Sequence, residues 1–503
     1  MKSKKIADLL DGFEYALIRG SLNVEISGIA THSEMVRKGD VFLALKGENT
    51  HGAKFITSAI NRGAVAVFCE EVVEPAGEVT FVKVKNLKDN LLSLLMKFYG
   101  NPSEDLLVTG ITGTNGKTTT AFLIHNINAQ CGDKGVLISS VEVSIGGEKQ
   151  SALLTTPDMA DLFRIFSEGK EKGCKNVVME VTSIGLEKRR CDWVNFDAGI
   201  FTNITRDHLD FHRTFEAYKN AKVRFFKELL QWSKKKRKVA ILNRDDPLWK
   251  DFIPGEGVET FTFSLSDPSA DVWAEKKSFS ESGITAEIKT PDRTLKVKSR
   301  FIGEHNLSNI LCAVTYGISM KLPVTSILKG IETMKLVPGR LEKVDVPVGS
   351  VFVDYAHTPD ALLRVLKALK EITKGRLIVL FGCGGDRDRG KRPEMGKVAC
   401  SFGDMVFVTS DNPRTEEPLK IIEDIMRGVE EAKRELKKDV ICVVEPDRRK
   451  AIRMAVSSLR EGDILLIAGK GHERYQILKD RMIPFVDAEE VKKAVEEMGA
   501  SYA

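Results

Sequence analysis

Cysteine is sparse in this chain, and the cysteines that are present form no metal-binding or disulfide pattern. Eight of them are scattered along 503 residues without a single C-x-x-C pair. Disulfide frameworks and cysteine zinc sites both need closely spaced cysteines. The absence of closely spaced cysteines excludes a small secreted scaffold and indicates reduced thiols in a cytoplasmic protein.

Long apolar runs and a strong charge imbalance are missing as well. No stretch approaches the roughly 20 apolar residues of a membrane span. Acidic residues interrupt the N-terminal segment MKSKKIADLLDGF, where a signal peptide needs an apolar region. The formal charge of +5 is small for this length; it suits an anionic substrate but gives no reason to expect nucleic acid. We therefore expect a cytoplasmic protein without membrane insertion.

Changes of pattern divide the chain into three parts, since 503 residues are too many for one hydrophobic core. The first part alternates short apolar runs with helix-like segments, which predicts a small α/β domain. The turn-rich segments YGNPSEDL (99–106) and KLVPGRLEKV (335–344) mark two joints. We expect domains at 1–103, 104–336 and 337–503.

The middle part alternates strand-like and helix-like stretches, which predicts a mostly parallel sheet covered on both faces. Its buried-strand candidates lie at 106–111, 176–181, 196–204 and 238–243. From about 259 to 302, polar and apolar residues alternate, and we expect an antiparallel appendage there.

The last part has five strand-like runs separated by helices, which predicts a doubly wound, Rossmann-like sheet. The runs lie at 351–356, 377–383, 405–410, 440–445 and 463–469. The glycine-rich segment GCGGDRDRG is not G-x-G-x-x-G, so the pattern predicts no nicotinamide cofactor.

The segment VTGITGTNGKTTTAF (108–122) lacks the first glycine of the standard phosphate loop. The pattern G-x-x-x-x-G-K-[ST] needs glycine where Ile111 stands, but Gly116, Lys117 and Thr118 fit it. A glycine turn between a strand and a helix exposes backbone N–H groups and the positive end of a helix dipole to a phosphate. We expect ATP here, with Mg²⁺ on Thr118; a plain connecting turn is the alternative.

Further polar residues follow the predicted central strands. Glu180 comes just after one buried strand, and Asp207 and His208 follow the next. At the carboxyl edge of a parallel sheet, a carboxylate and an imidazole could hold a second divalent ion. From the residues alone, a structural histidine is the more ordinary interpretation of His208, and a solvated helix lysine is that of Lys222.

The loop spelling TGTNGKTTT resembles the Mur ligase family, which includes the folylpolyglutamate synthetases and has G-T-x-G-K-T in this position. The resemblance extends over nearly the whole chain. It implies that Glu180 and His208 are metal ligands, and that Lys222 is carbamylated so that its new carboxylate faces Mg²⁺. It also implies that ATP is bound by Gly113, Thr114, Asn115, Gly116, Lys117, Thr118 and Thr119.

Three more segments match ATP-binding positions of that family. GEHNLSNI (303–310) resembles G-x-H-N-x-x-N, whose second asparagine contacts the adenine; here it is Asn309. PGRLE places Arg340 at the second joint, and VDYAHTPDAL places Asp354 at the nucleotide.

Three C-terminal segments resemble the MurE type, which adds the third residue of the peptidoglycan stem peptide. They are GGDRDRGKRP, DNPRTEEP and GKGHE, and each follows a strand-like run, so we expect them to converge at one edge of the sheet. An amino acid needs cations for its carboxylate, such as Arg387 and Arg414, and an anion for its ammonium, such as Glu473. Asp411, Asn412 and Gly469 complete the predicted amino-acid site.

In the family, D-N-P-R is associated with meso-diaminopimelate, because its arginine pairs with the extra carboxylate of that substrate. Lysine differs from diaminopimelate only by that carboxylate. The resemblance therefore implies meso-diaminopimelate as the added residue, with L-lysine as the alternative.

The N-terminal part departs most from the family. Its uridine-contacting D-S-R segment reads THSEM here, with His32 and Glu34 flanking the serine, and Ile184 replaces a histidine often found in the middle part. The positions that match ligands of the UDP-linked muramoyl dipeptide are Ser33, Thr155, Thr156, Ser183 and Arg190.

The resemblance implies an ATP-dependent amide ligase acting on UDP-MurNAc-L-Ala-D-Glu through an acyl phosphate. Its partners are then ATP, that nucleotide-linked dipeptide and a diamino acid, and we expect a monomer. The three C-terminal segments and the N-terminal part oppose folate polyglutamylation. A small-molecule kinase or NTPase and a non-catalytic nucleotide-binding regulator are the rivals from other classes.

Overall fold

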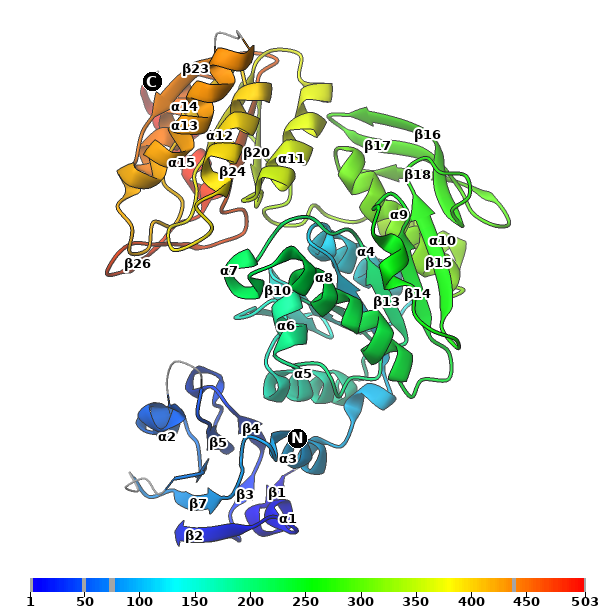
Figure 1. Ribbon diagram of the computed structural model, residues 1–503, viewed down its shortest axis with the longest axis vertical. Coiled ribbons are helices and arrows are strands. Elements are labelled where there is room, and N and C mark those ends of the chain that lie inside the picture. The colour runs from blue at the N-terminus through cyan, green and yellow to red at the C-terminus, as the bar shows by residue number, and fades with distance from the viewer. Residues whose placement is uncertain (1–2, 48–50, 72–76, 437–439, 502–503) are drawn as a thin grey trace.

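A computed structural model of the protein describes residues 3–47, 51–71, 77–436 and 440–501. Figure 1 shows three units stacked along the longest axis, from blue at the N-terminus to red near the C-terminus. Each unit has its own large β-sheet, so the expected three-part α/β organisation is confirmed. The joint expected near residue 103 lies between α3 and β8, and the one near 336 between α10 and β19. As domain boundaries, both stay predictions.

The N-terminal unit has a five-stranded sheet that is parallel except for the edge strand β2. In sheet order its strands are β2 (Tyr15–Arg19), β7 (Thr80–Val84), β6 (Ala66–Cys69), β5 (Asp40–Ala44) and β4 (Gly28–Ala30). Its helices are α1 (Ile6–Leu10), α2 (Ile56–Asn61) and α3 (Leu91–Tyr99), and the strands β1 (Lys4–Lys5) and β3 (Glu25–Ile26) form a small second sheet.

The central sheet has eleven strands and is parallel from β9 to β16. In sheet order they are β11 (Glu148–Ser151), β10 (Glu142–Ile145), β9 (Gly135–Ile138), β12 (Asn176–Glu180), β8 (Leu107–Thr112), β13 (Ala198–Phe201), β14 (Val239–Asn243), β15 (Glu259–Ser264), β16 (Val272–Ser280), β17 (Gly283–Lys289) and β18 (Thr294–Ser299). The four strands expected from apolar runs are β8, β12, β13 and β14.

The antiparallel appendage begins later than the sequence indicates. β15 pairs in parallel with β14, and β16 begins in parallel with β15, so both extend the main sheet. Within residues 259–302, antiparallel pairing joins only β16, β17 and β18. The first half of β15 is largely exposed, so its polar and apolar alternation reflects partial cover rather than antiparallel pairing.

Helices cover both faces of the central sheet. α4 (Lys117–Gln130), α9 (Glu304–Ser319) and α10 (Val324–Glu332) share one core with the sheet. α5 (Met159–Glu171), α6 (Ser183–Glu187) and α8 (Phe215–Arg224) share the other. The short helix α7 (Leu209–His212) precedes α8.

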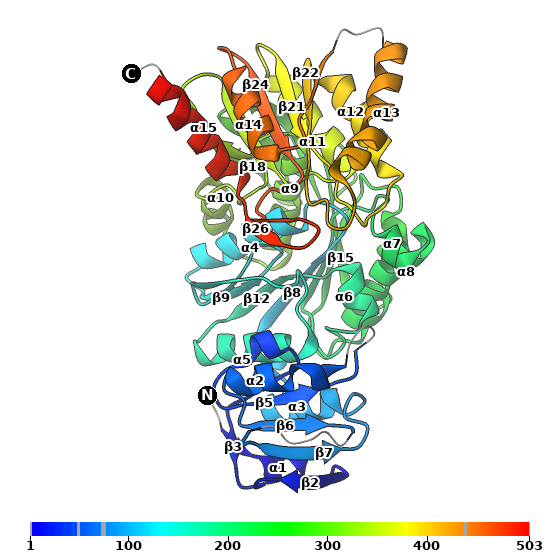
Figure 2. The ribbon, with the colours of Figure 1, turned by 90° about the vertical axis from the view of Figure 1, so that its left-hand side faces the viewer.

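The C-terminal unit is the expected doubly wound sheet. In sheet order its strands are β19 (Glu342–Val344), β20 (Ser350–Asp354), β24 (Ile464–Ala468), β21 (Leu377–Phe381), β22 (Met405–Val408) and β23 (Ile441–Val444), and only β19 is antiparallel. α11 (Pro359–Ile372), α12 (Lys391–Phe402) and α13 (Pro418–Leu436) cover one face, and α14 (Arg448–Ser457) and α15 (Asp487–Ser501) the other, as Figure 2 shows. A hairpin of β25 (Tyr475–Ile477) and β26 (Met482–Pro484) follows β24.

A buried ion pair joins the first two units. Arg164 on α5 donates from Nη2 to Oδ2 of Asp40 at 2.8 Å, and the two side chains are 6% and 3% exposed. The same guanidinium donates to the backbone oxygens of Ile29 and Met35, each at 2.9 Å. Figures 1 and 2 both place α5 between the N-terminal unit and the central sheet. The first two units are therefore fixed to each other by buried charge and a shared core.

Replacing Asp40 by alanine leaves the Arg164 charge buried without its partner. We expect Asp40→Ala to lower the free energy of unfolding by about 3 to 5 kcal/mol, measured by urea denaturation. The control is Lys85→Ala, because Lys85 pairs with Glu14 at the surface, where the side chains are 62% and 73% exposed. That change should stay within about 0.5 kcal/mol; equal effects of the two substitutions would contradict the role of the buried pair.

Candidate functional site

The glycine loop between β8 and α4 is packed too closely for side chains at two of its positions. Gly113 has φ +147°, and a Cβ there would lie 2.0 Å from Oγ1 of Thr202. Gly116 has φ +86°, and a Cβ there would lie 2.4 Å from Oδ1 of Asn309. Only glycine fits either position. The predicted loop and the predicted adenine-contacting asparagine are therefore direct neighbours.

The end of β13 holds the loop in shape. The backbone N–H of Asn115 donates to Oδ1 of Asn203 at 2.9 Å, and Nδ2 of Asn203 donates back to the oxygen of Asn115 at 3.0 Å. The Thr202 hydroxyl donates to that same oxygen at 2.7 Å. The Thr114 hydroxyl lies 2.8 Å from the hydroxyl of Tyr218 on α8. These bonds fix the loop before any ligand arrives.

Lys117 turns its ammonium back over the loop. Its Nζ donates to the backbone oxygens of Gly113 and Thr114, both at 2.9 Å. Burial lowers the pKa of Lys117, while the carboxylates of Glu180 and Asp207 oppose that shift. The lysine is thus held at the loop with two acidic side chains in electrostatic range.

Ser140 brings two predicted metal ligands together. The Thr118 hydroxyl lies 3.1 Å from the Ser140 hydroxyl, and the Ser140 N–H donates to Oε1 of Glu180 at 2.8 Å. Ser140 follows β9, the neighbour of β12, at the same sheet edge as Glu180. This serine was not predicted, because local patterns place it after an apolar run but do not bring it beside Glu180, forty residues further along the chain.

Lys222 on α8 is a buried lysine at this edge of the sheet. It is 1% exposed, its Nζ donates to the oxygen of Gly113 at 2.8 Å, and the ammonium lies 4.8 Å from the centre of the Tyr218 ring. Burial, with Lys117 adding to it, places the pKa of Lys222 well below its usual value. No carboxylate in the described part of the chain forms an ion pair with it. The interpretation of Lys222 as a solvated helix lysine is therefore wrong.

His208 lies close to these groups. Its Nε2 is 3.5 Å from Oδ2 of Asp207, and its backbone is left-handed at φ +51°. Burial lowers the pKa of His208, and the charges of Lys117 and Lys222 act in the same direction, against Asp207. Within the described residues, no group of three or more His, Cys, Asp or Glu side chains could hold a metal.

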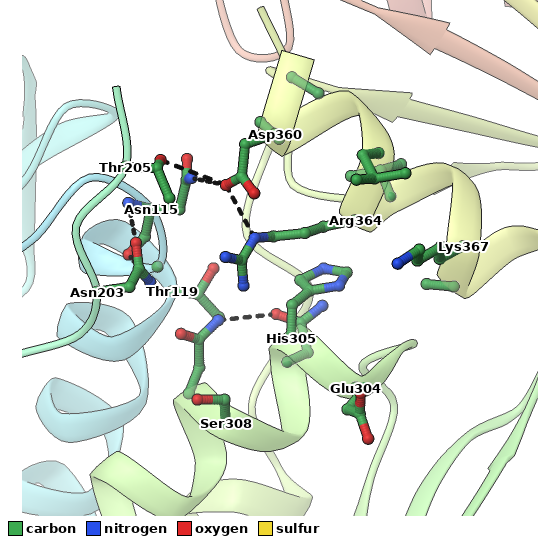
Figure 3. Close-up of a pocket in the computed structure, with 18 of the residues that line it drawn as sticks. Asn115, Thr119, Asn203, Thr205, Glu304, His305, Ser308, Asp360, Arg364 and Lys367 are labelled. Atoms are coloured by element: carbon green, nitrogen blue, oxygen red, sulfur yellow. Dashed lines mark hydrogen bonds and ion pairs between the residues drawn. The ribbon is translucent and has the colours of Figure 1, made fainter. Parts of the chain in front are cut away.

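A cavity of about 540 Å³ opens between the central and C-terminal units. Its walls include seven of the predicted nucleotide residues: Asn115, Gly116, Thr118, Thr119, Asn309, Arg340 and Asp354. Figure 3 shows Asp360 and Arg364 of α11 facing Asn115 and Thr205 across it. Oδ2 of Asp360 accepts from Nδ2 of Asn115 at 3.0 Å and from Nε of Arg364 at 2.9 Å. The cavity has the size and the polar lining of a small-molecule site.

Arg340 and Asp354 meet at the joint beside this cavity. Nη2 of Arg340 donates to the Thr118 hydroxyl at 3.3 Å, and its guanidinium lies 4.8 Å from the ring centre of Tyr355. Asp354 is buried and accepts from the N–H groups of Leu341 at 2.7 Å and Ala356 at 2.8 Å. Burial raises the pKa of Asp354, opposed by Arg340. Asp354 orders the joint that carries Arg340.

The three C-terminal segments converge at the carboxyl edge of their sheet, as expected. Asn412 follows β22, and its Nδ2 donates to Oε2 of Glu473, after β24, at 2.8 Å. Nη1 of Arg414 donates at 2.7 Å to the oxygen of Gly385, after β21. The remaining predicted residues are Asp411, which is buried, Gly469, with φ +115°, and Arg387, which is exposed.

Most predicted ligands of the UDP-linked dipeptide gather near Glu180. The Thr156 hydroxyl donates to the oxygen of Glu180 at 2.9 Å, and Nη1 of Arg190 donates to the oxygen of Thr156 at 2.9 Å. Ser183 is buried, and its hydroxyl has no hydrogen-bond partner in the part of the chain that the structure describes. Thr155 precedes Thr156 and is half-buried.

Ser33 reaches this group only through its neighbour. It begins a short 3-10 helix (Ser33–Met35), and the preceding His32 lies 2.5 Å from Asp158. Oδ1 of Asp158 also lies 2.6 Å from Nε of Arg190. The Asp158 carboxylate raises the pKa of His32. This contact links the altered uridine segment to the predicted dipeptide site.

Three family models match successive parts of the chain. They are the catalytic domain of the Mur ligase family over residues 25–99, the Mur ligase middle domain over 111–317 and the Mur ligase glutamate ligase domain over 339–471. A UDP-N-acetylmuramoyl-L-alanyl-D-glutamate–2,6-diaminopimelate ligase of Geobacter metallireducens is 44% identical over 493 residues, which cover 96% of each chain.

Two solved structures are similar to this chain over nearly its full length. One of a UDP-N-acetylmuramoyl-L-alanyl-D-glutamate–2,6-diaminopimelate ligase has a TM-score of 0.61 and 29% identity, covering 99% of this chain and 100% of that one. A MurF ligase of Thermotoga maritima, solved in complex with ADP, has a TM-score of 0.68 and 22% identity, covering 95% and 98%. The second likeness concerns the fold alone.

The tight contact at Gly116 gives a prediction about nucleotide affinity. In Gly116→Ala, the new Cβ meets Oδ1 of Asn309 at 2.4 Å, which displaces the loop or the asparagine. We expect the affinity for ADP, measured by titration calorimetry, to fall at least about tenfold.

Gly132→Ala is the matched control, because Gly132 has the same φ of +86° but no atom within 4 Å of its Cβ. It should cost about 1 to 2 kcal/mol of stability through backbone strain and leave ADP affinity unchanged. Equal loss of affinity in both variants would show that strain, and not the contact with Asn309, is responsible.

Proposed function

Because the chain belongs to the Mur ligase family, we propose that it joins 2,6-diaminopimelate to UDP-N-acetylmuramoyl-L-alanyl-D-glutamate in peptidoglycan synthesis, with ATP as the energy source. The observation that carries this proposal is the 44% identity over nearly the full length of a ligase named for this reaction. The converging amino-acid segments and the glycine loop beside a polar cavity support it.

The first half of the reaction forms an acyl phosphate. The γ-phosphoryl group of ATP passes to the free side-chain carboxylate of the D-glutamate residue, and ADP leaves. Lys117 and Arg340 supply positive charge where negative charge spreads over the transferred group. Asn309 lies against the loop at Gly116 and lines the same cavity, and the family resemblance implies that it contacts the adenine.

The residues around Ser140 fit Mg²⁺, because the Thr118 hydroxyl and the Glu180 carboxylate are the hard oxygen ligands that this ion prefers. When bound there, Mg²⁺ would neutralise charge on the phosphates. His208, with Asp207 beside it, fits a second cation, and a new carboxylate would complete that site. Lys222 can supply one, because its lowered pKa favours the neutral amine to which CO₂ adds.

The second half of the reaction forms the amide. The amine of diaminopimelate attacks the acyl phosphate, the tetrahedral intermediate releases phosphate, and the attacking nitrogen loses a proton. Glu473 and Asn412 receive the ammonium end of the amino acid, and Arg414 and Arg387 its carboxylates. The dipeptide is held beside Glu180 by Thr155, Thr156, Ser183 and Arg190. Ser33 lies toward the UDP end of the same substrate.

The part of the chain that the structure describes contains no helix with the length and apolarity of a bilayer span. The cytoplasmic location and the monomeric state expected from the sequence stay predictions.

One assay tests the proposed function. With UDP-MurNAc-L-Ala-D-Glu and ATP present, we expect ADP formation to depend on diaminopimelate, and kcat/KM for lysine to be lower by at least about 100-fold, because the arginine would be left without the carboxylate it binds. Arg414→Ala should reduce this preference. ADP formation that needs no amine would contradict a ligase and favour an NTPase.

A second test concerns Lys222. We expect Lys222→Ala to lower kcat by at least about 100-fold through loss of a group at the reacting carboxylate, and ¹³C-labelled bicarbonate to give a carbamate signal in the NMR spectrum of the wild type that the variant lacks. The control is Lys219→Ala, one turn earlier, where the lysine pairs with Glu216 and Asp251. Full activity of Lys222→Ala would exclude the carbamate.

A further inference from the structure

Lys470 is a fully buried lysine in the C-terminal unit, inside the GKGHE segment. Its Nζ donates to Oε2 of Glu473 at 2.8 Å and to Oδ1 of Asn412 at 3.1 Å. The same nitrogen lies 3.7 Å from Oδ1 of Asp411. Three of the predicted amino-acid ligands therefore surround one ammonium group that none of the preceding assignments uses.

The contacts of Glu473 leave its two carboxylate oxygens unequal. Oε2 accepts from Lys470 and from Nδ2 of Asn412, both at 2.8 Å. Within the described residues, no hydrogen bond reaches Oε1, and the side chain is 18% exposed. One oxygen is anchored in the protein, and the other is available to a ligand at the sheet edge.

Asn412 is held from the same side. Its Oδ1 accepts from Lys470 and from the N–H of Ile477 at 2.9 Å, and its Nδ2 donates to Glu473. The orientation of the amide is therefore fixed by an ammonium donor at the oxygen and a carboxylate acceptor at the nitrogen. Loss of the Lys470 ammonium removes one of the contacts that hold the Asn412 amide.

The charges around Lys470 explain why an ammonium is needed there. Asp411 and Glu473 are both acidic, and Oδ1 of Asp411 is buried without a hydrogen-bond partner in the described part of the chain. The neighbouring cation Arg448 is engaged by Asp487 at 2.7 Å, and Arg414 donates to Gly385. The ring centre of Tyr475 lies 5.7 Å from the ammonium. Lys470 therefore places one positive charge beside both carboxylates.

We propose that Lys470 is a positioning residue of the amino-acid site: it holds Oε2 of Glu473 and the amide of Asn412 in place, and it thereby aims the free oxygen of Glu473 at an ammonium group of the incoming diamino acid. Lys470 itself does not touch the substrate. The inference rests on the proposed function, because it takes the cluster of Asp411, Asn412 and Glu473 as the amino-acid site.

The test is a kinetic comparison of Lys470→Met, Lys470→Arg and the control Lys479→Met, which changes an exposed lysine in the nearby hairpin loop. We expect Lys470→Met to raise KM for diaminopimelate about 10- to 100-fold, with KM for ATP within about twofold of the wild type. Lys470→Arg should recover most of the affinity, and Lys479→Met should match the wild type.

Thermal unfolding and ADP affinity show whether each variant is folded. Where the methionine variant does not fold, Lys470→Gln replaces it, because an amide can still donate to Glu473 but carries no charge. An unchanged KM for diaminopimelate overturns the inference, and so does an equal rise of KM for ATP. A wild type that does not use diaminopimelate contradicts the proposed function instead, so the two failures are distinguishable.

Discussion

The close packing of the glycine loop against the end of β13 is the constraint on which the central site depends. At Gly113 there is room for a hydrogen and nothing larger, because Thr202 fills the space a Cβ would take. The backbone oxygen of Gly113 is thereby placed where both Lys117 and Lys222 donate to it. Two buried ammonium groups, from the start of α4 and the end of α8, therefore meet at one carbonyl group. A larger residue at position 113 would separate the loop from the sheet and move the ammonium groups of Lys117 and Lys222 apart.

Two buried lysines, Lys222 and Lys470, and the half-buried Lys117 illustrate that burial alone does not decide what a lysine does. Lys470 has a carboxylate at 2.8 Å, so its charge is compensated within the protein. Lys117 has two backbone oxygens and the more distant charges of Glu180 and Asp207. Lys222 has one backbone oxygen and an aromatic ring, with Lys117 opposing its charge. Since a buried charge is costly unless paired, the neutral form is most favoured at Lys222, and that amine is the one suited to modification.

The sequence predicts the order of the elements well, because apolar runs, glycines and turn residues act over a few neighbouring positions. Five of the six strands of the C-terminal sheet and the strand–loop–helix at Gly116 follow from such local signals. Ser140 could not be found in this way, since it meets Glu180 only through the pairing of β9 with β12, forty residues apart. Lys470 was missed for a similar reason: its meaning depends on Asn412, which another strand brings beside it. β15 was misjudged because one-sided cover produces the same alternation as antiparallel pairing.

The two joints of the chain differ physically, and this difference indicates where the molecule moves. The first two units share a continuous apolar core and the buried pair of Arg164 with Asp40, which are costly to separate. The C-terminal unit has cores of its own, which take in only Ile302 from the central unit. It faces the central unit across the cavity through polar contacts, such as Asn115 with Asp360 and Thr118 with Arg340. Polar contacts of this kind can open and re-form at small cost. The proposed dipeptide site is therefore built on a rigid frame, while the proposed amino-acid site is carried by the unit that is free to approach it. The proposed reaction needs such an approach, because its acyl phosphate must be kept from water until the amine arrives.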